Sequence, residues 1–246
     1  MSGEIVCPLR IRGLGWSCQV NACTQLREFA VSHHPLCFTA TDRLRAMECT
    51  FLWDLQLFSV LFTSHFNPLA SARASARRLV ESGEWCTSNF QSQPVNIPVE
   101  PLLTQADPHR VSLEQLSYFG IQRLSSPSRA TRAFWPSDSF ARKHGSWTGS
   151  DRLPNVCQIA HGLLCTATWL RLVELYPTEA LNSWTSERAL QHRARRDGTR
   201  RMPIPDGLIE LDGKPTAIEV VGQYSAAQLK RHVERFETQG WEWELW

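Results

Sequence analysis

The chain has 246 residues and a mass of 28.0 kDa, which allows one large domain or two small ones. It is 42% hydrophobic and 20% charged with a net charge of +2, so it is typical of a globular protein in which any basic surface is local. The most apolar stretch, residues 51–62, is interrupted by Asp54 and is too short to span a bilayer, and the N-terminus lacks a signal-peptide pattern. These features argue against a membrane protein and predict a cytoplasmic one whose eight cysteines are reduced.

Residues 1–40 are predicted to be an irregular N-terminal segment with scattered glycines, cysteines and prolines. Zinc sites use thiolate and imidazole ligands in two close pairs, and this segment offers such pairs. The alternative is that its cysteines are small buried side chains. The residues whose spacing is compatible with a structural zinc site are Cys18, Cys23, Cys37 and either His33 or His34.

Residues 41–105 predict a winged helix-turn-helix, a DNA-binding domain. Thr41 is a candidate cap for a first helix, and residues 67–68, Asn-Pro, begin a second helix that Gly83 ends. Residues 85–103 are expected to form the two strands of the wing.

Three arginines of the second helix, Arg73, Arg77 and Arg78, lie away from its apolar stripe of leucine and alanine. Arginines on a helix with small side chains can neutralise DNA phosphates at close approach. The alternative is an ordinary amphipathic helix with a solvated basic face. Residues 106–150, rich in Ser, Pro and Arg, are predicted to be a connector to the last segment, 151–246.

The last segment opens with a predicted helix of about twenty residues, because its apolar residues recur at spacings of three and four. His161 lies off this stripe and is interpreted from its position as a structural or surface histidine. A basic run follows between Arg188 and Arg201, where arginine forks suit phosphate groups, or where the charges are merely solvated. The arginines predicted to contact a phosphate backbone are Arg193, Arg195, Arg196, Arg200 and Arg201.

Two carboxylates lie on the hairpin that follows the basic run. Asp206 begins one short strand, Glu219 lies within the next, and an Asp-Gly turn joins them. Neighbouring antiparallel strands bring such side chains close together. Hard oxygen ligands at that spacing suit Mg²⁺ or Mn²⁺, which would activate water and polarise a phosphodiester. A helix over 225–240 and a strand over 241–246 complete the predicted segment.

The order of helix, Pro-Asp strand, hairpin, Glu strand, helix and strand resembles the PD-(D/E)XK nuclease superfamily. With the preceding winged helix, "PDGLIEL" and "AIEV" resemble the replication-relaxation family and the plasmid mobilisation relaxases of this fold. The resemblance implies an α+β fold (α/β core) in which a winged helix-turn-helix precedes an αβββαβ nuclease-like domain. It also implies metal ligands at Glu187, Asp206 and Glu219, a catalytic His161, and Mg²⁺- or Mn²⁺-dependent action on double-stranded DNA at a transfer origin.

The resemblance breaks at Val221, where the superfamily motif has lysine or, in some branches, glutamate. A lysine there would offset developing negative charge, which valine cannot do. Three interpretations stay open: Lys230 or Arg231 supplies the cation, Gln223 or Tyr224 substitutes for it with Tyr224 as a conceivable nucleophile, or the domain only binds DNA.

The sequence therefore predicts a DNA relaxase or nicking endonuclease of a mobile element, with accessory relaxosome proteins or a second copy of the chain as candidate partners. The alternative is a non-catalytic DNA-binding accessory protein or repressor. A structural α+β protein without DNA affinity is a third hypothesis.

Overall fold

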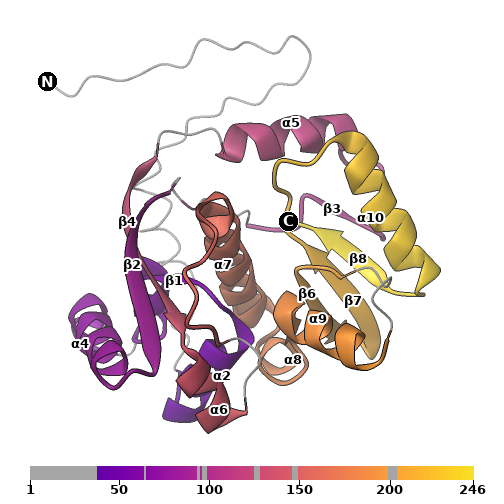
Figure 1. Ribbon diagram of the computed structural model, residues 1–246. Helices are drawn as coiled ribbons and strands as arrows, with labels where there is room; N and C mark the ends of the chain where they lie inside the picture. The colour runs from indigo at the N-terminus through magenta and orange to yellow at the C-terminus, as the bar shows by residue number, and fades with distance from the viewer. Residues whose placement is uncertain are drawn as a thin grey trace, which may run out of the picture. The chain divides into compact units, whose positions relative to one another are not determined.

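The structure is a computed structural model in which helices surround two separate β-sheets within one compact unit, so the predicted α+β class is confirmed (Figure 1). None of the helices in the described part of the chain has the length and apolar character needed to cross a membrane. The predicted zinc ligands, Arg200 and Arg201 lie outside the described residues. The structure describes residues 38–63, 65–92, 95, 99–124, 128–145, 149–198 and 204–246.

The first sheet has three antiparallel strands in the order β1-β4-β2. β2 (Trp85–Ser92) pairs along its whole length with β4 (Arg129–Pro136), and β1 (Trp53–Asp54) pairs with the other edge of β4. The predicted hairpin within residues 85–103 is therefore wrong. The end of that stretch, β3 (Leu103–Thr104), joins the other sheet. There Leu103 pairs with Leu245, and both side chains are buried in the same hydrophobic core.

The helices beside the first sheet begin and end largely as their capping residues predict. Asn67 caps α4 by accepting a hydrogen bond from the Ala70 amide at 3.1 Å, and Gly83 follows the helix with a φ of 73°. The first helix begins earlier than expected, because Thr39 rather than Thr41 makes its capping box. These helices are α2 (Ala40–Cys49), α3 (Leu55–Val60), α4 (Pro68–Glu81) and α6 (Asp138–His144).

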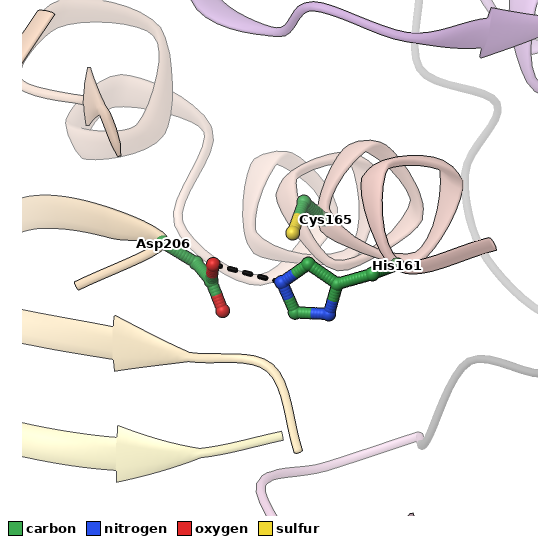
Figure 2. Close-up of side chains that lie close together, drawn as sticks. All are labelled: His161, Cys165 and Asp206. Atoms are coloured by element: carbon green, nitrogen blue, oxygen red, sulfur yellow. Dashed lines mark hydrogen bonds and ion pairs between the residues drawn. The ribbon is translucent and has the colours of Figure 1, made fainter. Parts of the chain in front are cut away.

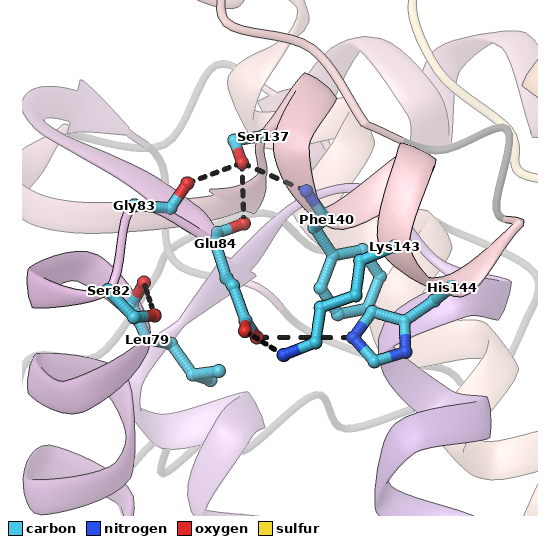
Figure 3. A network of polar contacts seen from close by, with 8 residues as sticks. All are labelled: Leu79, Ser82, Gly83, Glu84, Ser137, Phe140, Lys143 and His144. Atoms are coloured by element: carbon cyan, nitrogen blue, oxygen red, sulfur yellow. Dashed lines mark hydrogen bonds and ion pairs between the residues drawn. The ribbon is translucent and has the colours of Figure 1, made fainter.

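A polar network fastens α6 to the turn between α4 and β2 (Figure 3). The Ser137 hydroxyl donates to the carbonyls of Gly83 and Glu84 at 2.7 and 2.9 Å, and it accepts from the Phe140 amide at 3.2 Å. Lys143 forms an ion pair with Glu84. The second half of the predicted connector, which holds β4 and α6, is thus built into the first sheet and its helices.

The second sheet has five strands in the order β3-β8-β7-β6-β5. β6 and β7 form the predicted hairpin, whose turn residues Asp212 and Gly213 both have positive φ. β7 and β8 are parallel and are joined by α10, as a crossover connection requires. Their bounds are β5 (Thr185–Ser186), β6 (Gly207–Leu211), β7 (Lys214–Glu219), α10 (Ala226–Thr238) and β8 (Glu242–Leu245).

Two hydrophobic cores lie against this sheet. Ile209 and Ile218 belong to a core with residues of α7, whereas Ala217 and Val221 belong to a core with residues of α5 and α10. Since neighbouring residues of a strand face opposite sides, β7 is covered on both faces. The remaining helices are α5 (Leu113–Leu124), the 3-10 turn η1 (Val156–Gln158), α7 (Ile159–Leu175), α8 (Pro177–Asn182) and α9 (Glu187–Arg196).

Candidate functional site

Asp206 and Glu219 are cross-strand neighbours. Gly207 pairs with Ile218 in the β6–β7 ladder, so the same register continued by one residue sets Asp206 opposite Glu219. Residues directly opposite each other have Cβ atoms about 5 Å apart. The hairpin therefore brings these two acids together as the sequence predicts.

Glu219 is buried, with its side chain 3% exposed. Its Oε1 atom lies 2.8 Å from Nδ1 of His232 on α10, whereas no hydrogen-bond donor among the described residues reaches its Oε2 atom. Burial first, and then the negative charge of Asp206, raise the pKa of Glu219 to about 7. A buried carboxylate oxygen without a partner is costly, so a proton or a cation is needed there.

Asp206 is held between β7 and α7. Its Oδ2 atom accepts a hydrogen bond from the Val220 amide at 2.8 Å, and its Oδ1 atom lies 2.9 Å from Nε2 of His161 (Figure 2). The charge of Asp206 raises the pKa of His161 well above its ordinary value, so the contact favours the protonated imidazole.

Cys165 lies one helical turn after His161, on the same face of α7. Ligand atoms of His161, Cys165 and Asp206 all lie within 4.8 Å of one another, a group able to hold a metal ion. Burial raises the pKa of the Cys165 thiol to about 11, so without a metal ion the sulfur keeps its proton.

Glu187 is the third predicted acid, at the first position of α9. Its amide donates to the carbonyl of Asp206 at 3.0 Å, which fixes the start of α9 beside the hairpin. Partial desolvation and the charge of Asp206 raise the pKa of its carboxylate. Glu187, Asp206, His161 and Cys165 all line one cavity of about 160 Å³, whose walls include Phe51, Trp184 and Arg188.

Tyr224 follows β7 and lies close to the same acids. Burial, and then the charges of Asp206 and Glu219, raise the pKa of its phenol, so it stays protonated at neutral pH. Its ring centroid is 5.3 Å from that of His232. Gln223, the other predicted substitute for the lysine, is exposed.

The structure explains the valine at position 221. Val221 is fully buried between the sheet and α5, where a Cβ atom added to Gly120 would lie 3.0 Å from its Cγ1 atom. A lysine there would place an ammonium group in an apolar core. Val221 is a packing residue in this chain.

Lys230 and Arg231 are not brought to the acids. Both are exposed on α10: Lys230 pairs with Glu234 at 3.7 Å, and Arg231 donates to the Ala227 carbonyl at 3.3 Å. Residues 229 and 236 are the buried positions of this helix, so the helical period turns 230 and 231 outward.

The predicted DNA-contacting arginines that the structure describes are exposed. Ala72 and Ala76 bury one side of α4, while Arg77 pairs with Glu81 at 2.8 Å on the solvent side. On α9, Ala194 is the buried residue and Arg196 pairs with Asp197 at 2.9 Å. The exposed arginines of the two helices are Arg73, Arg77, Arg78, Arg193, Arg195 and Arg196.

Sequence reasoning missed two residues of the site, His232 and Cys165. The signal for His232 is its spacing of three from Leu229 and four from Phe236, which places it toward the buried side of α10. The signal for Cys165 is its spacing of four from His161. Comparisons with protein-family models, with curated proteins and with solved structures find no match to this chain.

Proposed function

We propose that this protein is a divalent-metal-dependent DNA nicking endonuclease of the relaxase kind, acting at a transfer origin. The observation that carries the proposal is Asp206 opposite Glu219, with one buried carboxylate oxygen of Glu219 lacking a partner among the described residues. Two adjacent carboxylates repel each other unless a cation lies between them. An Mg²⁺ or Mn²⁺ ion bound there would polarise a phosphodiester and lower the pKa of a water molecule.

The three predicted acids, here called the acid cluster (Asp206, Glu219 and Glu187), and two neighbouring histidines each have a role in this proposal. Asp206, Glu219 and Glu187 would bind the ion, with Glu187 open to solvent at the cavity. His232 orients Glu219 through Oε1 and leaves Oε2 for the ion, which is the support that ligating carboxylates usually receive. His161 would hold a proton close to Asp206 and the scissile phosphate.

The order of elements in the first half supports duplex DNA as the substrate. Helix α2, strand β1, helices α3 and α4, and then β2 and β4 in the sheet order β1-β4-β2 follow the order of a winged helix-turn-helix. In this chain the wing would be replaced by the long excursion between β2 and β4, which carries β3 and α5 to the second sheet. The exposed arginines of α4 and α9 would bind phosphates.

One observation favours the non-catalytic alternative, a DNA-binding accessory protein or repressor. Val221 is buried, and Lys230 and Arg231 point away from the acids. None of these three residues therefore supplies the positive charge that the motif lysine of the superfamily would place beside the developing negative charge. A binder of this kind would share the arginine surfaces but would need no metal ion.

Nicking of a supercoiled plasmid that carries the cognate transfer origin, in the presence of Mn²⁺, tests the proposal. Glu219→Gln and Asp206→Asn should each reduce nicking by more than the ~10–100-fold loss typical of residues that only support a metal ligand. Glu210→Gln is the matched control, because Glu210 is an exposed acid on the same hairpin.

The two functions give different results in this experiment. If the Glu219 and Asp206 variants nick as well as the parent protein, the catalytic assignment is wrong. If the parent binds the plasmid but never nicks it, and Mn²⁺ binding by calorimetry does not depend on Glu219, the accessory protein is the better account.

A further inference from the structure

The donor atoms of His161, Cys165 and Asp206 differ in kind from those of the acid cluster. They are an imidazole nitrogen, a thiol sulfur and one carboxylate oxygen, and Mg²⁺ binds neither sulfur nor imidazole well. In a tetrahedral zinc site the ligand atoms are separated by roughly 3.3–3.6 Å, because Zn–N and Zn–O distances are about 2.0 Å and Zn–S about 2.3 Å. The observed 2.9 Å from His161 to Asp206, and the 4.8 Å that contains all three atoms, bracket those separations.

The three side chains are held in place by rigid elements. His161 and Cys165 are four residues apart on α7, a helix with one face packed in the first core, so their side chains project side by side (Figure 2). Asp206 is fixed from the opposite side, because its Oδ2 atom accepts the Val220 amide hydrogen bond while Oδ1 faces His161. A carboxylate fixed through one oxygen presents the other to a metal ion.

We propose that His161, Cys165 and Asp206 bind a divalent ion of the zinc class, with the fourth coordination position open to the cavity. Three protein ligands and an open position are the pattern of catalytic rather than structural zinc sites. All three residues line the cavity of about 160 Å³, which is large enough for a water molecule or a phosphate oxygen at that position. The ion would also displace the thiol proton, since coordination deprotonates a thiol. It would take the place of the hydrogen bond between His161 and Asp206, so with this ion bound His161 acts as a ligand and not as the proton donor described above.

Asp206 connects this site to the acid cluster. It faces His161 through Oδ1, and it lies opposite Glu219 in the hairpin register. An ion at each side would share this carboxylate, which is the arrangement of two-metal phosphodiester cleavage. Only this shared role rests on the proposed function; the zinc-class site rests on the geometry of the three donors.

Titration of the full chain with Co²⁺ under reducing conditions tests the site. Co²⁺ takes zinc-type sites, and its near-ultraviolet thiolate charge-transfer band reports sulfur coordination. The Cys165→Ser variant should bind one equivalent of Co²⁺ fewer than the parent and should lack the charge-transfer absorbance that this equivalent adds. His161→Gln should weaken Co²⁺ binding at least about 10-fold. Cys86→Ser is the control, because Cys86 is a free, partly buried cysteine on β2 outside this cluster.

The same comparison separates this site from the predicted N-terminal zinc residues, because a Cys18→Ser, Cys23→Ser variant should keep the contribution of Cys165. If Cys165→Ser binds as many equivalents as the parent with an unchanged band, the proposal is wrong. Zn²⁺ protection of Cys165 from alkylation in the parent protein, read by peptide mass spectrometry, provides a second measurement that needs no variant; an unchanged alkylation rate would also overturn the proposal.

Glu219→Gln makes the outcome independent of the proposed function. That variant should keep the Cys165-dependent band even though nicking is lost. If the protein shows the band but does not nick DNA with any metal ion, the zinc-class site stands and the endonuclease proposal is wrong. If the protein nicks DNA with Mg²⁺ but shows no Cys165-dependent band, the endonuclease proposal stands and the zinc-class site is wrong.

Discussion

At the scale of single residues, Glu219 is costly to bury in the folded protein. Its carboxylate is buried, its Oε2 atom has no partner among the described residues, and burial raises its pKa from 4.5 to about 7. Hydrogen bonding to Glu219 in turn raises the pKa of His232. The folded protein therefore binds protons more tightly than the unfolded chain at both groups. The metal-free protein loses stability as the pH rises from the ordinary pKa of each group to its raised value, which for Glu219 is from 4.5 to about 7.

Glu219→Gln should remove most of this pH dependence. Between pH 4.5 and about 7 the folded parent retains a proton that the unfolded chain has lost. At about 1.4 kcal/mol for each tenfold change in proton affinity, the parent should lose roughly 2–3 kcal/mol of unfolding free energy, relative to the variant, between pH 5 and pH 8.

Urea unfolding with a chelator present at the two pH values measures this difference in stability. Glu210→Gln, on an exposed position of the same hairpin, should change the free energy of unfolding equally at both. If Glu219→Gln differs from the parent by the same unfolding free energy at pH 5 and at pH 8, the cost assigned to the buried carboxylate is wrong.

At the scale of elements, α9 links the acid cluster to a basic surface. Glu187 begins the helix beside Asp206, and the exposed arginines Arg193, Arg195 and Arg196 lie in its last turns. A phosphate backbone lying along α9 would thus reach from the arginines to the acids. Basic side chains near a helix C-terminus also interact favourably with the helix dipole, so these arginines have a structural role as well.

The triple variant Arg193→Ala, Arg195→Ala, Arg196→Ala distinguishes the two roles. If the arginines bind phosphates, each contact contributes about 0.9 to the slope of log affinity against log salt concentration, so the slope should flatten by roughly 2 to 3. Arg110→Ala is the control, because Arg110 is exposed and already paired with Glu100. An unchanged slope measured by fluorescence anisotropy on duplex DNA would assign α9 a purely structural role.

At the scale of the whole molecule, the excursion between β2 and β4 joins the two sheets. It supplies β3 to the edge of the second sheet and α5 to the core behind β7. α5 packs so closely on the segment after Glu219 that a Cβ atom added to Gly120 would lie 2.0 Å from the Gly222 carbonyl oxygen. The helix therefore supports the backbone from which the Val220 amide holds Asp206.

Gly120→Ala should destabilise the protein by about 1–3 kcal/mol or more, the usual cost of overpacking against a rigid neighbour. It should also weaken Mn²⁺ binding, because the shift of residues 220–222 moves the amide that orients Asp206. Chemical unfolding and calorimetry measure the two effects. The control Ile121→Ala alters an exposed neighbour on the same helix, and equal behaviour of the two variants would contradict the close packing.

The sequence by itself determined the local features of this protein. Helix caps such as Asn67, the Asp-Gly hairpin turn and the facing of Asp206 and Glu219 follow from capping, turn chemistry and strand register, which act over a few residues. Only the tertiary structure decided that β2 pairs with β4, that His232 rather than Lys230 contacts Glu219, and that Cys165 joins His161 and Asp206. These contacts join separate segments of the chain. Which segments meet depends on which hydrophobic core buries each face of a strand or helix.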